Sequence, residues 1–78
     1  MSLSFPQYRK YKNEKSFFKI ISLTEWEEIQ LVGTKKLTHH FTVKILPDRN
    51  FMQDMLFDYS TNWLKIEEEE YNNFKNAL

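Results

Sequence analysis

The segment from Lys36 to Leu46 places the strongest constraint on the fold, because its side chains alternate in character along the chain. One side of an extended strand would carry Leu37, His39, Phe41, Val43 and Ile45, and the other side Thr38, His40, Thr42 and Lys44. A period of two is typical of a β-strand that buries one face. Since a strand needs backbone partners, the sequence predicts a sheet built around this segment.

Three segments upstream have the composition of strands. They are Tyr8–Lys12, Ser16–Ile21 and Trp26–Val32. Asn13-Glu14 lies between the first two segments and fits a tight turn. Ser22 is followed three residues later by Glu25, which is the pattern of a helix capping box. Residues 22–32 could therefore form either a strand or a helix.

Pairing across the loops favours a strand for residues 22–32. A four-residue loop over 22–25 pairs Ile21 with Trp26, so that apolar residues meet on one side and opposite charges on the other. A three-residue loop over 33–35 pairs Leu31 with Leu37, whereas a two-residue loop would mix the two faces. Because a slip of one residue moves every side chain to the opposite face, the sequence predicts the longer loops.

This register assigns a core face and an outer face to the predicted four-stranded antiparallel meander. The core face carries Phe18, Ile20, Ile29, Leu31, Leu37, Phe41, Val43 and Ile45. The outer face carries Phe17, Lys19, Ile21, Trp26, Glu28, Gln30, Thr38, His40, Thr42 and Lys44. It also brings Glu28 opposite His40.

Two short helices are predicted after the long strand. Asn50 and Gln53 have the spacing of a cap and its partner, and the following apolar side comprises Phe51, Met52, Met55, Leu56 and Tyr59. A terminal helix over Glu67–Leu78 has its apolar stripe at Tyr71, Phe74 and Leu78. Both helices are expected to cover the core face. Trp63–Ile66 is a candidate fifth short strand, either parallel to the long strand or at an edge of the sheet.

The predicted architecture is therefore a single α+β domain over residues 1–78. Residues 1–4 carry no weight in this prediction, because three origins stay open for them: native and ordered, native and disordered, or derived from an expression vector. The chain has no cysteine, which removes disulfides and thiolate metal sites and indicates a cytoplasmic location. No apolar run has the length of a membrane span. An aromatic content of 17% compensates for the small size of the core.

Three segments together resemble a family of small uncharacterised bacterial proteins. They are Phe17–Ile20, Trp26–Ile29 and Lys44–Leu56, so the resemblance spans most of the chain. It implies no activity, ligand or catalytic residue, because no function is attached to that family.

The sequence gives little indication of an enzyme. His39 and His40 are neighbours on a strand, so they point to opposite faces and cannot chelate one ion together. Glu28 opposite His40 supplies two ligands where a metal site needs three or four. The chain has one glycine and lacks a phosphate loop or a nucleophile elbow. We therefore expect no catalytic residue, no metal and no cofactor.

The predicted outer face carries the principal functional hypothesis. Phe17, Ile21 and Trp26 would form an apolar group there, rimmed by Lys19, Glu28 and His40. An apolar patch with a charged rim is typical of an interaction surface. The partner would be another protein or a second copy of the chain, and no membrane is expected. The alternative is that a helix covers this face, which makes the group ordinary core.

A second hypothesis concerns the N-terminal strands. Tyr8, Arg9, Lys10, Tyr11 and Lys12 interleave rings with cations, as single-stranded nucleic-acid platforms do. Against it, the formal net charge is zero, whereas nucleic-acid binders are usually basic.

Overall fold

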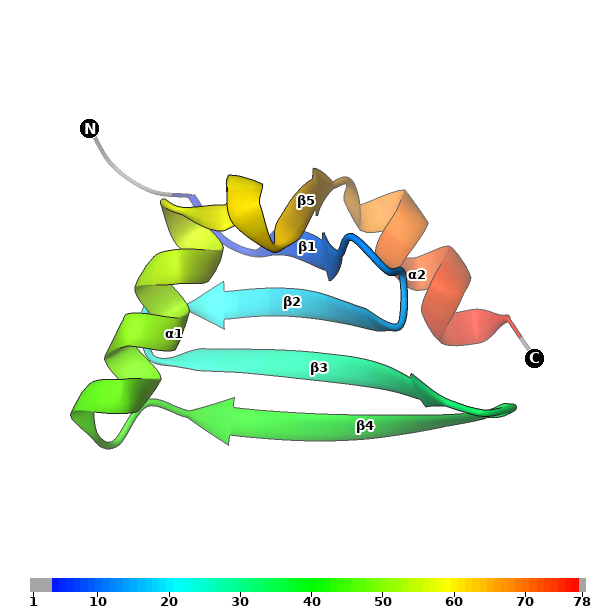
Figure 1. Ribbon diagram of the computed structural model, residues 1–78, viewed down its shortest axis with the longest axis horizontal. Helices are drawn as coiled ribbons and strands as arrows, with labels where there is room; N and C mark the ends of the chain where they lie inside the picture. The colour runs from blue at the N-terminus through cyan, green and yellow to red at the C-terminus, as the bar shows by residue number, and fades with distance from the viewer. Residues whose placement is uncertain (1–3, 78) are drawn as a thin grey trace.

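Five strands form one antiparallel sheet in the order β4-β3-β2-β1-β5, in a computed structural model that describes residues 4–77 (Figure 1). The strands are β1 (Gln7–Tyr11), β2 (Ser16–Ser22), β3 (Glu25–Val32), β4 (Lys35–Thr42) and β5 (Trp63–Ile66). The helices are α1 (Leu46–Leu56), the short 3-10 helix η1 (Tyr59–Thr61) and α2 (Glu68–Asn76). The predicted α+β class and four-stranded meander are confirmed.

The two alternatives that the sequence left open are now decided. Residues 25–32 form a strand, and β5 pairs antiparallel with β1 at the edge of the sheet. Of the segment 1–4, only Ser4 lies within the described residues, and the prediction for residues 1–3 lies outside them. Leu78, which was expected in the terminal helix, lies outside them as well.

The loops after β2 and β3 are shorter than predicted, since Ser22 pairs with Glu25 and Val32 with Lys35, whereas the turn at Asn13-Glu14 lies where it was expected. Asn13 Oδ1 accepts the backbone N–H of Lys15 at 2.8 Å, and Glu14 takes a left-handed φ of 59°. In the hairpin that joins β3 to β4, Val32 pairs with Lys35, so only Gly33 and Thr34 form the loop. Gly33 has a φ of 64°, a conformation that glycine adopts at low cost and that two-residue hairpin loops require.

The predicted register is wrong by one residue in both hairpins. Ile20 pairs with Trp26 where Ile21 was expected, and Gln30 pairs with Leu37 where Leu31 was expected. A bulge between Ile20 and Ser22 accompanies the first change. The prediction matched apolar residues as though only one face were buried. In fact helices cover both faces, so apolar side chains are needed on both sides and their alternation cannot fix the register.

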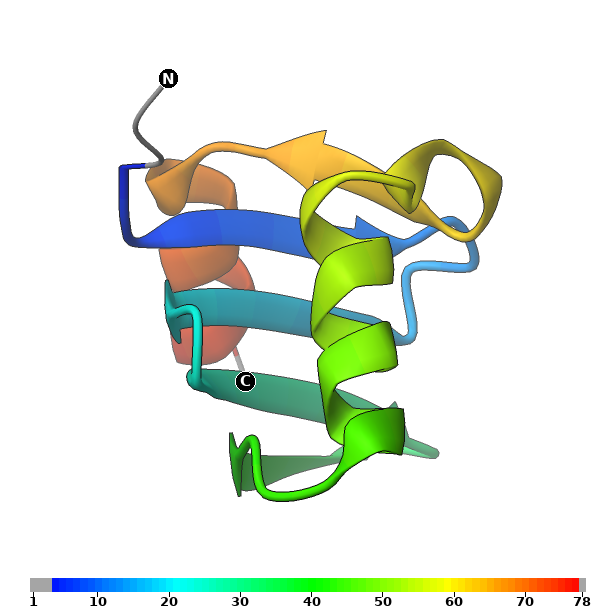
Figure 2. The ribbon, with the colours of Figure 1, turned by 90° about the vertical axis from the view of Figure 1, so that its left-hand side faces the viewer.

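Figure 2 shows α1 in front of the sheet and α2 behind it, so the prediction that both helices share one face is wrong. We call the two sides of the sheet the α1 face and the α2 face. The core on the α1 face contains Phe18, Ile20, Trp26, Met52, Met55, Leu56 and Trp63. The core on the α2 face contains Tyr8, Phe17, Ile29, Ile66 and Tyr71. The predicted core face is thus split between two cores, with Phe18 and Ile20 in the first and Ile29 in the second. The prediction is wrong for Leu37, Phe41 and Ile45, which are exposed, and no helix covers the part of the α1 face that carries Leu37 and Phe41.

Helix α1 begins earlier than the cap predicted at Asn50. The carboxylate of Asp48 accepts the backbone N–H groups of Lys44 at 3.1 Å and Ile45 at 3.3 Å. Pro47 lies in the first turn, where its missing N–H costs no helical hydrogen bond. This start places α1 across one end of the sheet, and the rest of the α1 face has no helix over it (Figure 1).

Candidate interaction site

The six residues of the predicted outer patch do not share a surface. The observed register places Phe17, Lys19 and His40 on the α2 face and Trp26 and Glu28 on the α1 face, while Ile21 lies at the bulge of β2 and is 36% exposed. Phe17 is only 4% exposed, and its ring stacks on Phe74 of α2 at a centroid distance of 3.9 Å. A helix therefore covers the predicted anchor, as the alternative interpretation anticipated.

Trp26 belongs to the core on the α1 face. Its side chain is 4% exposed, and its ring stacks with Phe41 at 5.0 Å and with Phe51 at 5.3 Å. The predicted pair of Glu28 with His40 is also wrong, because Glu27 lies opposite His40. His40 Nε2 instead lies 3.1 Å from Glu25 Oε2 on the sheet surface.

Several side chains of the predicted aromatic-basic platform are buried or paired within the fold. Arg9 is 2% exposed; its guanidinium donates to the Met55 carbonyl, to the Tyr8 carbonyl and to Gln7 Oε1, each at 2.8 Å. It also lies 4.4 Å from the centroid of the Tyr59 ring. Its role is to tie β1 to the end of α1. A guanidinium held in this way is not free to bind a phosphate.

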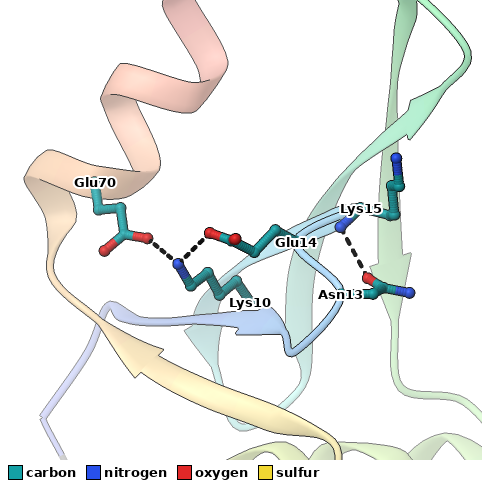
Figure 3. Close-up of polar contacts among 5 residues, drawn as sticks. All are labelled: Lys10, Asn13, Glu14, Lys15 and Glu70. Atoms are coloured by element: carbon teal, nitrogen blue, oxygen red, sulfur yellow. Dashed lines mark hydrogen bonds and ion pairs between the residues drawn. The ribbon is translucent and has the colours of Figure 1, made fainter.

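Lys10 is held between two carboxylates. Its ammonium group lies 2.7 Å from Glu14 in the turn and 2.6 Å from Glu70 of α2 (Figure 3). The hydrogen bonds to Glu14 and Glu70 raise the pKa of Lys10. Two anions compensate this cation locally, so the strand presents less positive charge than its sequence indicates.

Two tyrosines of the α2 face donate hydrogen bonds to glutamates. Tyr8 donates to Glu68 at 3.1 Å, and Tyr71 donates to Glu27 at 2.7 Å. Burial, followed by these hydrogen bonds, raises the pKa of both phenols. Since each phenol is a donor, both interactions join α2 to the sheet only while the phenol is protonated.

The outer edge of β4 is the longer of the two unpaired edges of the described sheet, since β5 at the opposite edge has 4 residues. β4 is 8 residues long, and no other strand within residues 4–77 pairs with that edge. Leu37 and Phe41 lie next to it on the α1 face and are 44% and 37% exposed. A long open edge flanked by exposed apolar side chains is a template for pairing with another chain. The lysines at the start of β4, which are typical of edge strands, were the sequence signal for this position.

A hollow of about 370 Å³ lies on the α1 face beside the first turns of α1. Its lining residues are Tyr11, Trp26, Glu28, Phe41, Pro47, Asp48 and Phe51. A second hollow of about 590 Å³ shares Tyr11 and Phe51 with the first and extends toward Trp63. No local sequence pattern predicts either hollow, because the walls of each come from four separate elements.

Within the described part of the chain, no group of three or more His, Cys, Asp or Glu side chains could hold a metal ion. Nor does any helix of residues 4–77 have the length and apolar character needed to cross a membrane.

Comparisons with protein-family models, with curated proteins and with solved structures find no match to this chain. The resemblance to a bacterial family noted from the sequence therefore stays a prediction. The open edge of β4 and the aromatic hollow beside α1 are the features from which function must be inferred.

Proposed function

We propose that this chain is a non-enzymatic protein-interaction module that pairs with a second copy of itself at the open edge of β4. The observation that carries the proposal is the length and exposure of that edge, which no described strand covers. Adding a strand to a sheet edge is a common way for one protein to bind another. The absence of cysteine supports a cytoplasmic setting for this association.

The backbone groups available at the edge follow from the β3–β4 ladder. In an antiparallel pair, alternate residues direct their N–H and C=O groups toward the partner strand. Val43 N–H donates to the Thr24 carbonyl at 2.7 Å, so odd-numbered residues of this segment bond inward. The even-numbered residues Lys36, Thr38, His40 and Thr42 therefore direct their backbone groups outward, where an incoming strand can pair with them.

The side chains of β4 favour one self-complementary register. A two-fold axis through His39 places Leu37 of one copy opposite Phe41 of the other on the α1 face. The same axis places Thr38 opposite His40 on the α2 face. Apolar side chains then meet on one side of the joined sheet and polar side chains on the other, which is the arrangement that stabilises cross-strand pairs. A shift of the pairing by two residues in either direction keeps the backbone hydrogen bonds but loses the contact between Leu37 and Phe41.

Proline at position 38 tests this proposal, because it removes an outward N–H without removing a hydrogen bond to β3. Proline is tolerated in edge strands where the N–H faces solvent. We expect the wild-type chain and the control Thr38→Val to sediment as dimers of the 9.6 kDa chain, and Thr38→Pro to sediment as a monomer with wild-type circular dichroism.

Two results would overturn the proposal. One is a wild-type chain that stays monomeric at every concentration, and the other is a Thr38→Pro variant that dimerises as well as Thr38→Val. Leu37→Lys provides a second disruption that leaves the backbone unchanged. This side chain is 44% exposed in one copy, so the substitution is expected to spare the fold and to prevent the apolar contact with Phe41.

A further inference from the structure

The walls of the smaller hollow on the α1 face are mostly aromatic. Tyr11 comes from β1, Trp26 from β3, Phe41 from β4 and Phe51 from α1. Tyr11 packs edge-on against Phe18 at 4.9 Å, and Trp26 stacks between Phe41 and Phe51. These contacts fix the rings before any ligand arrives. A preformed site avoids the entropy cost of ordering its side chains on binding.

The charged side chains that line this hollow are both acidic. Glu28 accepts a hydrogen bond from Ser16 Oγ at 2.7 Å through one of its two carboxylate oxygens. Asp48 accepts the two backbone N–H groups at the start of α1 through one oxygen as well. Each carboxylate is therefore anchored by one oxygen. Neither lysine nor arginine is among the residues that line the hollow.

The Glu28 carboxylate acts on Tyr11, which lines the same hollow. Burial, and after it the nearby Glu28 carboxylate, raises the pKa of the Tyr11 phenol. The Glu28 carboxylate therefore favours a positive charge over a negative one beside Tyr11. The faces of Trp26 are covered by Phe41 and Phe51, so a cation in the hollow would meet the half-exposed Phe41 ring, whose quadrupole attracts cations.

We propose that this hollow binds the guanidinium of an arginine side chain from a basic peptide. Guanidinium is planar, weakly hydrated and stacks on aromatic faces, and it also pairs with carboxylates. A hollow of about 370 Å³ has the volume of a small-ligand site and accommodates one such side chain. The neighbouring hollow beyond Tyr11 and Phe51 leaves room for the next residue of an extended peptide. This site goes beyond the β4 contact and lies within a single copy of the chain.

The test is a titration with a short acetylated and amidated peptide containing one arginine, compared with the same peptide containing citrulline. Citrulline keeps the shape of arginine and removes its charge. Trp26 lines the hollow and Trp63 lines its neighbour, so tryptophan fluorescence reports binding, and NMR shifts of Tyr11 and Phe51 locate it. We expect the citrulline peptide to bind at least tenfold more weakly.

Glu28→Gln is the informative variant, because an amide oxygen can still accept the hydrogen bond from Ser16 while the negative charge is lost. We expect it to weaken binding of the arginine peptide several-fold. The matched control Glu69→Gln alters an exposed carboxylate of α2 and is expected to leave binding unchanged. Equal binding of the two peptides, equal binding by the two variants, or no binding of the arginine peptide would each overturn the proposal.

Phe41 belongs both to the hollow and to the proposed β4 contact, so binding is also measured on a variant that is expected to be monomeric. The same titration on Thr38→Pro is expected to give the wild-type affinity, since the hollow needs no second copy. Loss of both dimerisation and arginine binding in Thr38→Pro would contradict the assignment of the hollow to a single copy. Loss of arginine binding alone would leave the β4 proposal intact.

Discussion

Single residues in this chain are poorly described by their character in the sequence. Trp26 was predicted to be an exposed anchor, but it lies in the core. Arg9 was predicted to contact nucleic acid, but it is buried against α1. In both cases the partner that buries the residue is distant in sequence: Phe51 for Trp26, and Met55 for Arg9. A local pattern cannot reveal a partner 25 or more residues away.

Replacing Trp26 should therefore unfold the chain rather than weaken association. Trp26→Ala removes a large ring from between Phe41 and Phe51 and is expected to cost about 3–5 kcal/mol of unfolding free energy. A domain of 78 residues has little stability to spare, so we expect the variant to be largely unfolded at 25 °C. Urea denaturation followed by circular dichroism measures the change.

The control for this prediction is Phe57→Ala, since Phe57 is 58% exposed just beyond α1. Its midpoint in urea should lie close to that of the wild type. A Trp26→Ala variant as stable as Phe57→Ala would show that the stack with Phe41 and Phe51 is not part of the core.

At the scale of elements, the sequence predicted which segments are strands and helices more accurately than how they meet. The alternation in β4 and the apolar sides of α1 and α2 were sufficient to identify those elements. The pairing of β2 with β3 and of β3 with β4 was wrong by one residue. Phe17 and Phe18 are adjacent and both buried, on opposite faces, so either neighbour could have been assigned to a single core.

Helix α2 is attached to the sheet by two protonated phenols, which makes its docking sensitive to alkaline pH. The pKa of Tyr71 is raised in the folded state by burial and by the hydrogen bond to Glu27. A raised pKa contributes stability that is fully present below the unfolded value, about pH 10 for tyrosine, and that is lost as the pH rises above it. We expect unfolding free energy to fall above that pH by about 1.4 kcal/mol per unit for this group.

Tyr71→Phe tests the assignment. It should lower stability at neutral pH by roughly 0.5–1.5 kcal/mol, the usual value of one hydrogen bond, and should make the alkaline loss shallower. Tyr59→Phe serves as the control for removal of a phenol elsewhere. Denaturant titrations between pH 8 and pH 11.5 give both profiles, and an alkaline slope for Tyr71→Phe equal to that of the wild type would contradict the role of this phenol.

At the scale of the whole molecule, the decisive feature is that α1 and α2 lie on opposite faces of one sheet (Figure 2). Composition and periodicity predicted the α+β class, but they cannot tell whether a second helix returns to the same face. The placement of the two helices on opposite faces determines which surfaces of the sheet stay accessible. With both faces partly covered, the accessible features are the edge of β4 and the aromatic hollow beside α1. They share only part of the predicted patch: His40 lies on β4, and Trp26 and Glu28 line the hollow.

The most direct test of the β4 contact uses the fact that the chain contains no cysteine. The proposed two-fold axis passes through position 39, where the two copies form a pair without backbone hydrogen bonds and with Cα atoms about 4.5 Å apart. Cysteines at that separation can form a disulfide. A His39→Cys variant should therefore cross-link rapidly with itself under mild oxidation, as seen on a non-reducing gel.

Leu64→Cys is the matched control, because Leu64 lies on the opposite edge strand β5 and is 44% exposed. We expect nearly complete cross-linking of His39→Cys, while Leu64→Cys stays mostly monomeric. Cross-linking of His39→Cys no faster than that of Leu64→Cys would contradict pairing of β4 with β4.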